Sequence, residues 1–261
     1  MKAIKISGKM MQAWVAVLFI LTMTVNLYGR TVTPGTVKDE LDKAKKAGNA
    51  VFLVITGTGA TGVDELVTIA NDANKKVKKS AVIKLDRDDV ANSDLVTKFG
   101  VAGVQLPFVL ILSPKGYAVG GFPAANATAD NLVNLIPSPK YDLVLDALNN
   151  KKPVFVVASK KSFTDKATAV ATCKSAVDKV PSKPIIVEID MDDANEATFL
   201  KQIGVNTVAT STVTVVINTA GNITGNYTGA TDAQTLATSA TKVVKSCCGG
   251  GSSKGCGSPK K

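Results

Sequence analysis

Hydrophobic positions between residues 35 and 245 change repeatedly between two spacings, which predicts helices that alternate with buried strands. Residues 36–48 carry apolar side chains at helical spacing and end at Gly48, and residues 50–55 then form a continuous apolar run. An apolar run this short, followed by Gly57, is typical of a strand covered on both faces. The pattern therefore predicts an α/β fold, in which a mixed central sheet lies between two layers of helices.

The rest of the first half continues the alternation. Ser113, Pro114 and Gly116 predict a hairpin turn, because proline presets the first bend and glycine suits the end of the turn. We expect a helix over residues 63–78, a strand over 81–85, a short helix that ends at Gly100, strands over 108–112 and 117–122, and a helix over 129–136.

The chain repeats itself after about a hundred residues. Residues 83–89 (IKLDRDD) return at an offset of 104 as residues 187–193 (VEIDMDD). Upstream, residues 51–54 (VFLV) return at an offset of 103 as residues 154–157 (VFVV). Two long copies indicate a tandem duplication, because a solenoid needs at least three shorter repeats.

The boundary between the two copies is expected near residue 137. Ser138 is a favoured N-cap residue, and Pro139 suits the first position of a helix. The second copy should contain helices over 141–148 and 163–179, strands over 154–158 and 185–189, and a hairpin over 213–227. The predicted organisation is an N-terminal segment over 1–29, domains over 30–137 and 138–245, and a tail over 246–261.

Composition and charge exclude several classes of function. The chain has no histidine, so it cannot build a Ser-His-Asp triad, a Cys-His dyad or an imidazole metal site. Six lysines at the two ends account for most of the net charge of +10, which leaves +4 for the rest. With two arginines and one tryptophan, the chain lacks the usual groups of a nucleic-acid reader. We therefore predict no nucleic-acid partner.

The first thirty residues have the pattern of a targeting segment. Three lysines precede an apolar run over residues 13–21, and polar residues follow it. This pattern predicts a signal peptide and an exported protein, periplasmic or extracellular. The alternative is an uncleaved membrane anchor formed by residues 10–27, which would be the only contact with a membrane.

The order of elements resembles the thioredoxin fold over residues 35–245. The residues that carry the resemblance are 82–86 (VIKLD), 98–101 (KFGV), 104–111 (VQLPFVLI) and the hairpin over 116–121. The resemblance implies that Pro107 is the cis-proline opposite the active-site loop and that Leu106 offers its backbone to an extended peptide. The alternative for Pro107 is a turn before a strand.

The redox chemistry of thioredoxins needs a Cys-x-x-Cys motif at the start of the long helix, where the helix lowers the pKa of the first thiol. Residues 61–64 (TGVD) and 163–166 (FTDK) stand at that place in the two copies, and neither contains cysteine. In the second copy, Ser211 or Thr212 replaces the proline. The resemblance therefore implies a redox-inactive groove, lined in the first copy by Thr61, Asp64, Leu106 and Pro107.

Side chains near this groove have structural interpretations. Thr61 and Thr164 are predicted to cap helices, because no base is available to activate their hydroxyls. The acidic turns, which could hold calcium, are predicted to form turns and caps instead. These turns contain Asp86, Asp88 and Asp89 in the first copy and Asp190, Asp192 and Asp193 in the second.

The four cysteines fall into two groups. Cys173 lies in an apolar helical stretch and is predicted to be a buried structural thiol. Cys247, Cys248 and Cys256 stand in a glycine- and serine-rich tail, where they could bind Cu(I) or Zn(II), form a disulfide, or stay idle.

Three functional hypotheses follow. The first is an exported, redox-inactive protein that binds peptides or proteins, as a chaperone-like module and not as an enzyme. The second is a thiol-disulfide oxidoreductase or soft-metal-handling protein that uses the tail cysteines. The third is a structural component of an envelope.

Overall fold

The computed structural model describes residues 35–244. The N-terminal segment over 1–29 lies outside the described residues, as do Cys247, Cys248 and Cys256 in the tail. Within the described range, no helix combines the length and the apolar character that a membrane span requires.

The first sheet has four strands in the order β2-β1-β3-β4. Strand β1 (Ala50–Thr56) is parallel to β2 (Ser80–Asp86) and antiparallel to β3 (Phe108–Leu112), and β3 is antiparallel to β4 (Ala118–Pro123). Every residue of β1 except the last is buried. The prediction of a mixed sheet with a central strand covered on both faces is confirmed.

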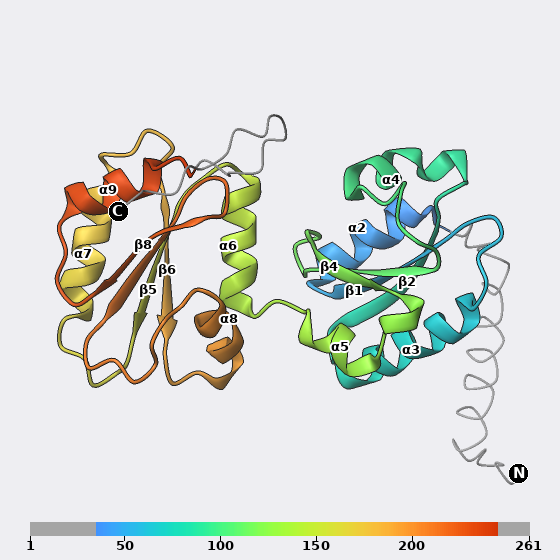
Figure 1. Ribbon diagram of the computed structural model, residues 1–261, viewed down its shortest axis with the longest axis horizontal. Coiled ribbons are helices and arrows are strands. Elements are labelled where there is room, and N and C mark those ends of the chain that lie inside the picture. Colours follow the sequence, from blue (N-terminus) through green and yellow to red (C-terminus); the bar gives the residue numbers. More distant parts are fainter. Residues whose placement is uncertain (1–34, 245–261) are drawn as a thin grey trace, which may run out of the picture. The chain divides into compact units, whose positions relative to one another are not determined.

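Two pairs of helices cover this sheet (Figure 1). Leu53 packs in one core cluster with residues of α2 (Val37–Ala47) and α4 (Ser93–Phe99). Phe52 packs in another cluster with residues of α3 (Val63–Lys76) and α5 (Ala129–Asn134). Because successive side chains of a strand point to opposite faces, β1 contributes to both clusters.

The second copy repeats this arrangement. Its sheet has the order β6-β5-β7-β8, with the same parallel and antiparallel pairs. Its own two core clusters lie on the two faces of this sheet. Its elements are α6 (Pro139–Asn149), β5 (Val154–Ser159), α7 (Lys166–Val177), β6 (Ile185–Asp190), α8 (Ala197–Gln202), β7 (Val213–Ile217), β8 (Ile223–Thr228) and α9 (Ala233–Thr241).

The start of α6 is as predicted. The Oγ of Ser138 accepts a hydrogen bond from the backbone N–H of Tyr141, at 3.2 Å, and Pro139 is the first helical residue. Glu196, which is 2% exposed, accepts hydrogen bonds from the Ser138 hydroxyl and from the backbone N–H of Lys140. This buried carboxylate is therefore fully engaged in capping a helix.

The acidic turns also serve as caps. Asp89 accepts a hydrogen bond from the N–H of Ala91, and Asp193 accepts one from the N–H of Asn195. Each aspartate begins a short 3₁₀ turn, η1 (Val90–Asn92) in the first copy and η3 (Ala194–Glu196) in the second. The prediction that these residues form turns and caps is confirmed.

The long helix of the second copy is shorter than the predicted range of 163–179. Helix α7 begins at Lys166 and ends at Val177. It begins late because the carboxylate of Asp165 binds the backbone of a distant segment, as described below. It ends early because the chain leaves the helix in turns, and Lys183 has a positive φ of 47°.

Candidate functional site

Three segments of the first copy meet at one end of its sheet. The loop after β1, the turn after β2 and the segment before β3 all lie there, because β1 and β2 are parallel and β3 runs the opposite way. This end is the place where the resemblance predicts a groove.

The Leu106–Pro107 peptide bond is cis, as the resemblance implied. Pro107 is buried, and its carbonyl accepts a hydrogen bond from the N–H of Ala124, at 3.0 Å. Leu106 is half-buried. Its backbone N–H and C=O take part in no hydrogen bond within residues 35–244.

The loop after β1 approaches Leu106 closely at Gly57. A Cβ atom at this position would lie 2.9 Å from Cδ1 of Leu106 and 2.8 Å from Oδ2 of Asp88. Both distances are shorter than a real Cβ atom shows. A larger residue at position 57 would therefore force the side chain of Asp88 or Leu106 to shift.

Asp88 holds the loop in place. Its Oδ2 accepts a hydrogen bond from the backbone N–H of Thr58, at 2.6 Å. The hydrogen bonds from Thr58, together with the charge of Arg87, lower the pKa of Asp88. Arg87 in turn donates from Nη1 to the carbonyl of Val104, at 2.7 Å. The acidic turn thus links the loop after β1 to the segment before β3, a role that the sequence did not predict.

Thr61 and Asp64 are exposed at the start of α3. The prediction that Thr61 caps this helix is wrong. The N-cap residue is Gly62, in the left-handed region at a φ of 78°, and no side chain caps the helix. Thr61 stands one residue too early to serve as the cap. The same correction applies to Thr164, because Asp165 precedes α7.

The second copy closes the equivalent groove with its own side chains. Thr212 takes the place of Pro107, immediately before β7, and is buried. Its hydroxyl donates to Oδ1 of Asp165, at 2.6 Å, and its N–H donates to Oδ2, at 3.0 Å. The hydroxyl of Ser159 lies 3.1 Å from that of Thr212. Asp165 therefore bridges the start of α7 to the segment before β7.

The strand order, the four covering helices and the cis-proline before β3 agree with what the resemblance implied. The chain is a tandem of two thioredoxin-like domains. No family model matches the sequence, and none of the curated proteins matches it.

Solved structures of paired thioredoxin domains are similar to this chain. The first two thioredoxin domains of Naumovozyma dairenensis Eps1p are 10% identical to it, with 78% of this chain and 95% of that chain covered and a TM-score of 0.29. Those of Saccharomyces cerevisiae Eps1p are 10% identical, with 78% and 96% covered and a TM-score of 0.26. The NTD_N/C domain of alkylhydroperoxide reductase AhpF from Enterococcus faecalis is 12% identical, with 78% and 99% covered and a TM-score of 0.28.

The thiol of the second thioredoxin-like domain lies in the core. Cys173 is fully buried in α7, and burial raises its pKa to about 12. A thiol with this pKa is almost entirely protonated at neutral pH, whereas thiol exchange requires the thiolate. The prediction of a buried structural cysteine is confirmed.

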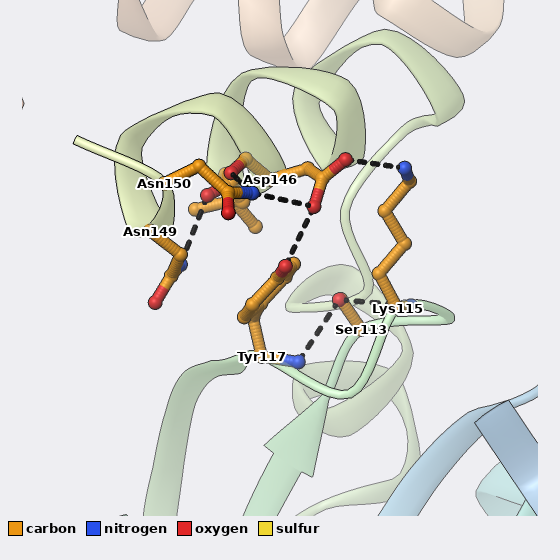
Figure 2. Close-up of polar contacts among 7 residues, drawn as sticks. Ser113, Lys115, Tyr117, Asp146, Asn149 and Asn150 are labelled. Atoms are coloured by element: carbon orange, nitrogen blue, oxygen red, sulfur yellow. Dashed lines mark hydrogen bonds and ion pairs between the residues drawn. The ribbon is translucent and has the colours of Figure 1, made fainter. Parts of the chain in front are cut away.

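A second polar cluster joins the β3–β4 turn to α6 (Figure 2). The hydroxyl of Tyr117 donates to Oδ1 of Asp146, at 2.6 Å, and Nζ of Lys115 lies 2.7 Å from Oδ2. The Oγ of Ser113 accepts hydrogen bonds from the N–H groups of Lys115 and Tyr117. These contacts raise the pKa of Tyr117 to about 12, chiefly because the phenol donates to the carboxylate.

We expect Tyr117 to ionise near pH 12 and Asp146→Asn to lower this pKa toward 10, the ordinary value for tyrosine. A pKa raised in the folded state stabilises the fold below pH 10, and this contribution is lost as the pH rises from 10 to about 12. Ultraviolet titration of the phenolate would measure the shift, and Tyr117→Phe would assign it. An unchanged titration curve in Asp146→Asn would contradict the hydrogen bond.

Proposed function

We propose that the first thioredoxin-like domain binds an extended peptide segment at Leu106, without redox chemistry. The observation that carries the proposal is the unengaged backbone N–H and C=O of Leu106 beside a half-buried apolar side chain. An extended peptide can pair with such a backbone as an added strand does, and the neighbouring side chains then set its specificity.

The rim of the groove favours a peptide with basic side chains. Asp64 and Glu65 lie in the first turn of α3, and both are exposed. Asp88, which holds the loop after β1, already faces Arg87, with 3.8 Å between its Oδ1 and Nε of the arginine. The two carboxylates at the start of α3 would attract lysine or arginine next to an apolar residue of the peptide.

The proposal assigns one peptide site to the chain. In the second domain, Asp165 is already hydrogen-bonded to both the backbone and the side chain of Thr212. A peptide would have to displace these bonds, including one to a buried hydroxyl, before it could enter. The second domain then has a structural role, and the N-terminal pattern supports action outside the cytosol.

Leu106→Ala should weaken peptide binding about fivefold, because it removes the apolar part of the contact at a partly buried position. The probe is a synthetic peptide with a lysine on each side of a leucine, and the readout is its dissociation constant. Ser211→Ala, at the matching position of the second domain, is the control and should leave binding unchanged.

Amide chemical shifts of the labelled protein would locate the contact. We expect the largest changes at Leu106 and at the loop around Thr61. Equal binding by Leu106→Ala and the parent, or shift changes centred on Ser211, would contradict the proposal.

A further inference from the structure

A cavity of about 350 Å³ lies between α2 and α4 on one face of the first sheet. Figure 1 shows these two helices side by side on that face. The volume is within the range of about 300–1,000 Å³ that small-molecule sites occupy. The floor of the cavity is apolar and consists of Leu41, Val51, Leu95, Phe99 and Leu112.

The second domain carries an aromatic pair at the equivalent positions. At the repeat offsets, Lys38 corresponds to Tyr141 and Leu95 corresponds to Phe199. The rings of Tyr141 and Phe199 stack, with centroids 4.7 Å apart and planes 14° apart. They line a separate cavity, whereas Lys38 and Leu95 line the cavity of the first domain. The two copies therefore line the space at these helices with different side chains.

The other end of the cavity shows the same contrast. Lys45 corresponds to Leu148, which packs against the core of the second domain. Cδ1 of Leu148 would lie 3.8 Å from a Cβ atom on Gly221, and Cδ of Lys45 would lie 3.5 Å from one on Gly116. The stem of Lys45 thus follows the path of the leucine, but it ends in an ammonium group.

The rim of the cavity is charged only in the first domain. Lys38, Lys45 and Lys98 line it together with Asp42 and Asp94, a net charge of +1. Among the residues that the structure describes, no ion pair involves any of these five. Their counterparts in the second domain are all uncharged: Tyr141, Leu148, Gln202, Leu145 and Thr198.

We propose that this cavity binds a small amphipathic anion, with an apolar chain or ring on the floor and a single carboxylate or sulfonate at the lysines. The apolar floor supplies the burial of the chain, and the lysine stems can extend over it while their ammonium groups reach the anion. Asp42 and Asp94 disfavour a ligand with several negative charges. Leu106 does not line this cavity, although it packs against the same core cluster.

Octanoate is the probe, and its binding to the full chain is measured by calorimetry. The double variant Lys38→Tyr/Leu95→Phe copies the aromatic pair of the second domain into the first. This variant should fold, because the second domain accommodates the same aromatic pair at the equivalent positions. It should weaken octanoate binding at least tenfold, because the rings would occupy space in the cavity. Ser211→Ala, in the second domain, is the control and should leave octanoate binding unchanged.

A second variant, Lys45→Gln/Lys98→Gln, keeps the cavity and removes charge. It should weaken octanoate at least fivefold and leave 1-octanol unaffected, so it decides the matter even if the first variant fails to fold. Undetectable octanoate binding by the parent would overturn the proposal. The proposal would also be overturned if both variants bound octanoate as tightly as the parent does. It would be overturned as well if the second variant lost affinity for octanoate and for 1-octanol to the same extent.

Discussion

Residues 30–245 should leave the reduction of insulin by dithiothreitol at its uncatalysed rate. Thiol-disulfide exchange requires a thiolate, and the starts of α3 and α7 carry no cysteine. The remaining thiol of this segment, Cys173, is buried with a pKa raised to about 12. The turbidity of reduced insulin measures the rate. Rapid insulin reduction by residues 30–245 would contradict the redox-inactive interpretation.

The double variant Thr61→Cys/Asp64→Cys makes this prediction sharper. It places a Cys-x-x-Cys motif at the start of α3 and opposite Pro107, where a helix N-terminus lowers a thiol pKa. We expect this variant to reduce insulin at least about tenfold faster than the parent. It is therefore a positive control, which shows that the assay can detect activity at this position. Full-length protein run in parallel tests the tail cysteines, because activity that needs residues 246–261 would support the oxidoreductase alternative.

Phe52→Ala and Phe155→Ala should each destabilise one domain by about 3–5 kcal/mol. These phenylalanines are fully buried and occupy the same position in the two sheets. Each belongs to a core cluster of its own domain. For a domain of about 100 residues, this loss lowers the unfolding temperature by at least about 12 °C.

Differential scanning calorimetry of residues 30–245 should show that each substitution moves one transition and leaves the other in place. Native-state hydrogen exchange of the two central strands would assign the transitions to their domains. If both variants lower a single shared transition, the two copies form one cooperative unit, and the predicted boundary near residue 137 does not separate folding units.

The elements of the fold could be predicted because their signals are local. Apolar runs identified β1 and β5, the Pro-Gly turn identified the β3–β4 hairpin, and the repeat transferred the first copy's order to the second. The cis Leu106–Pro107 bond followed from a resemblance, since periodicity carries no information about peptide isomers.

The contacts that define the two grooves could not be predicted in this way. Asp165 and Thr212 are 47 residues apart, and an aspartate before a helix ordinarily indicates a cap. Asp88 and Thr58 are likewise 30 residues apart. The α2–α4 cavity depends on side-chain volumes across two helices. The repeat offsets pair the residues of the two copies, but only the structure shows which of them line a common space.

The strand order has a consequence for solubility. Strands β2 and β6 are edge strands within the described part of the chain, so each has a row of backbone groups that another sheet could pair with. Lys84 and Glu188 are exposed at matching positions of these strands. Charges at such positions oppose edge-to-edge aggregation, although Glu188 also pairs with Lys166 at 2.9 Å. The duplication thus places a lysine on one edge strand and a glutamate on its counterpart.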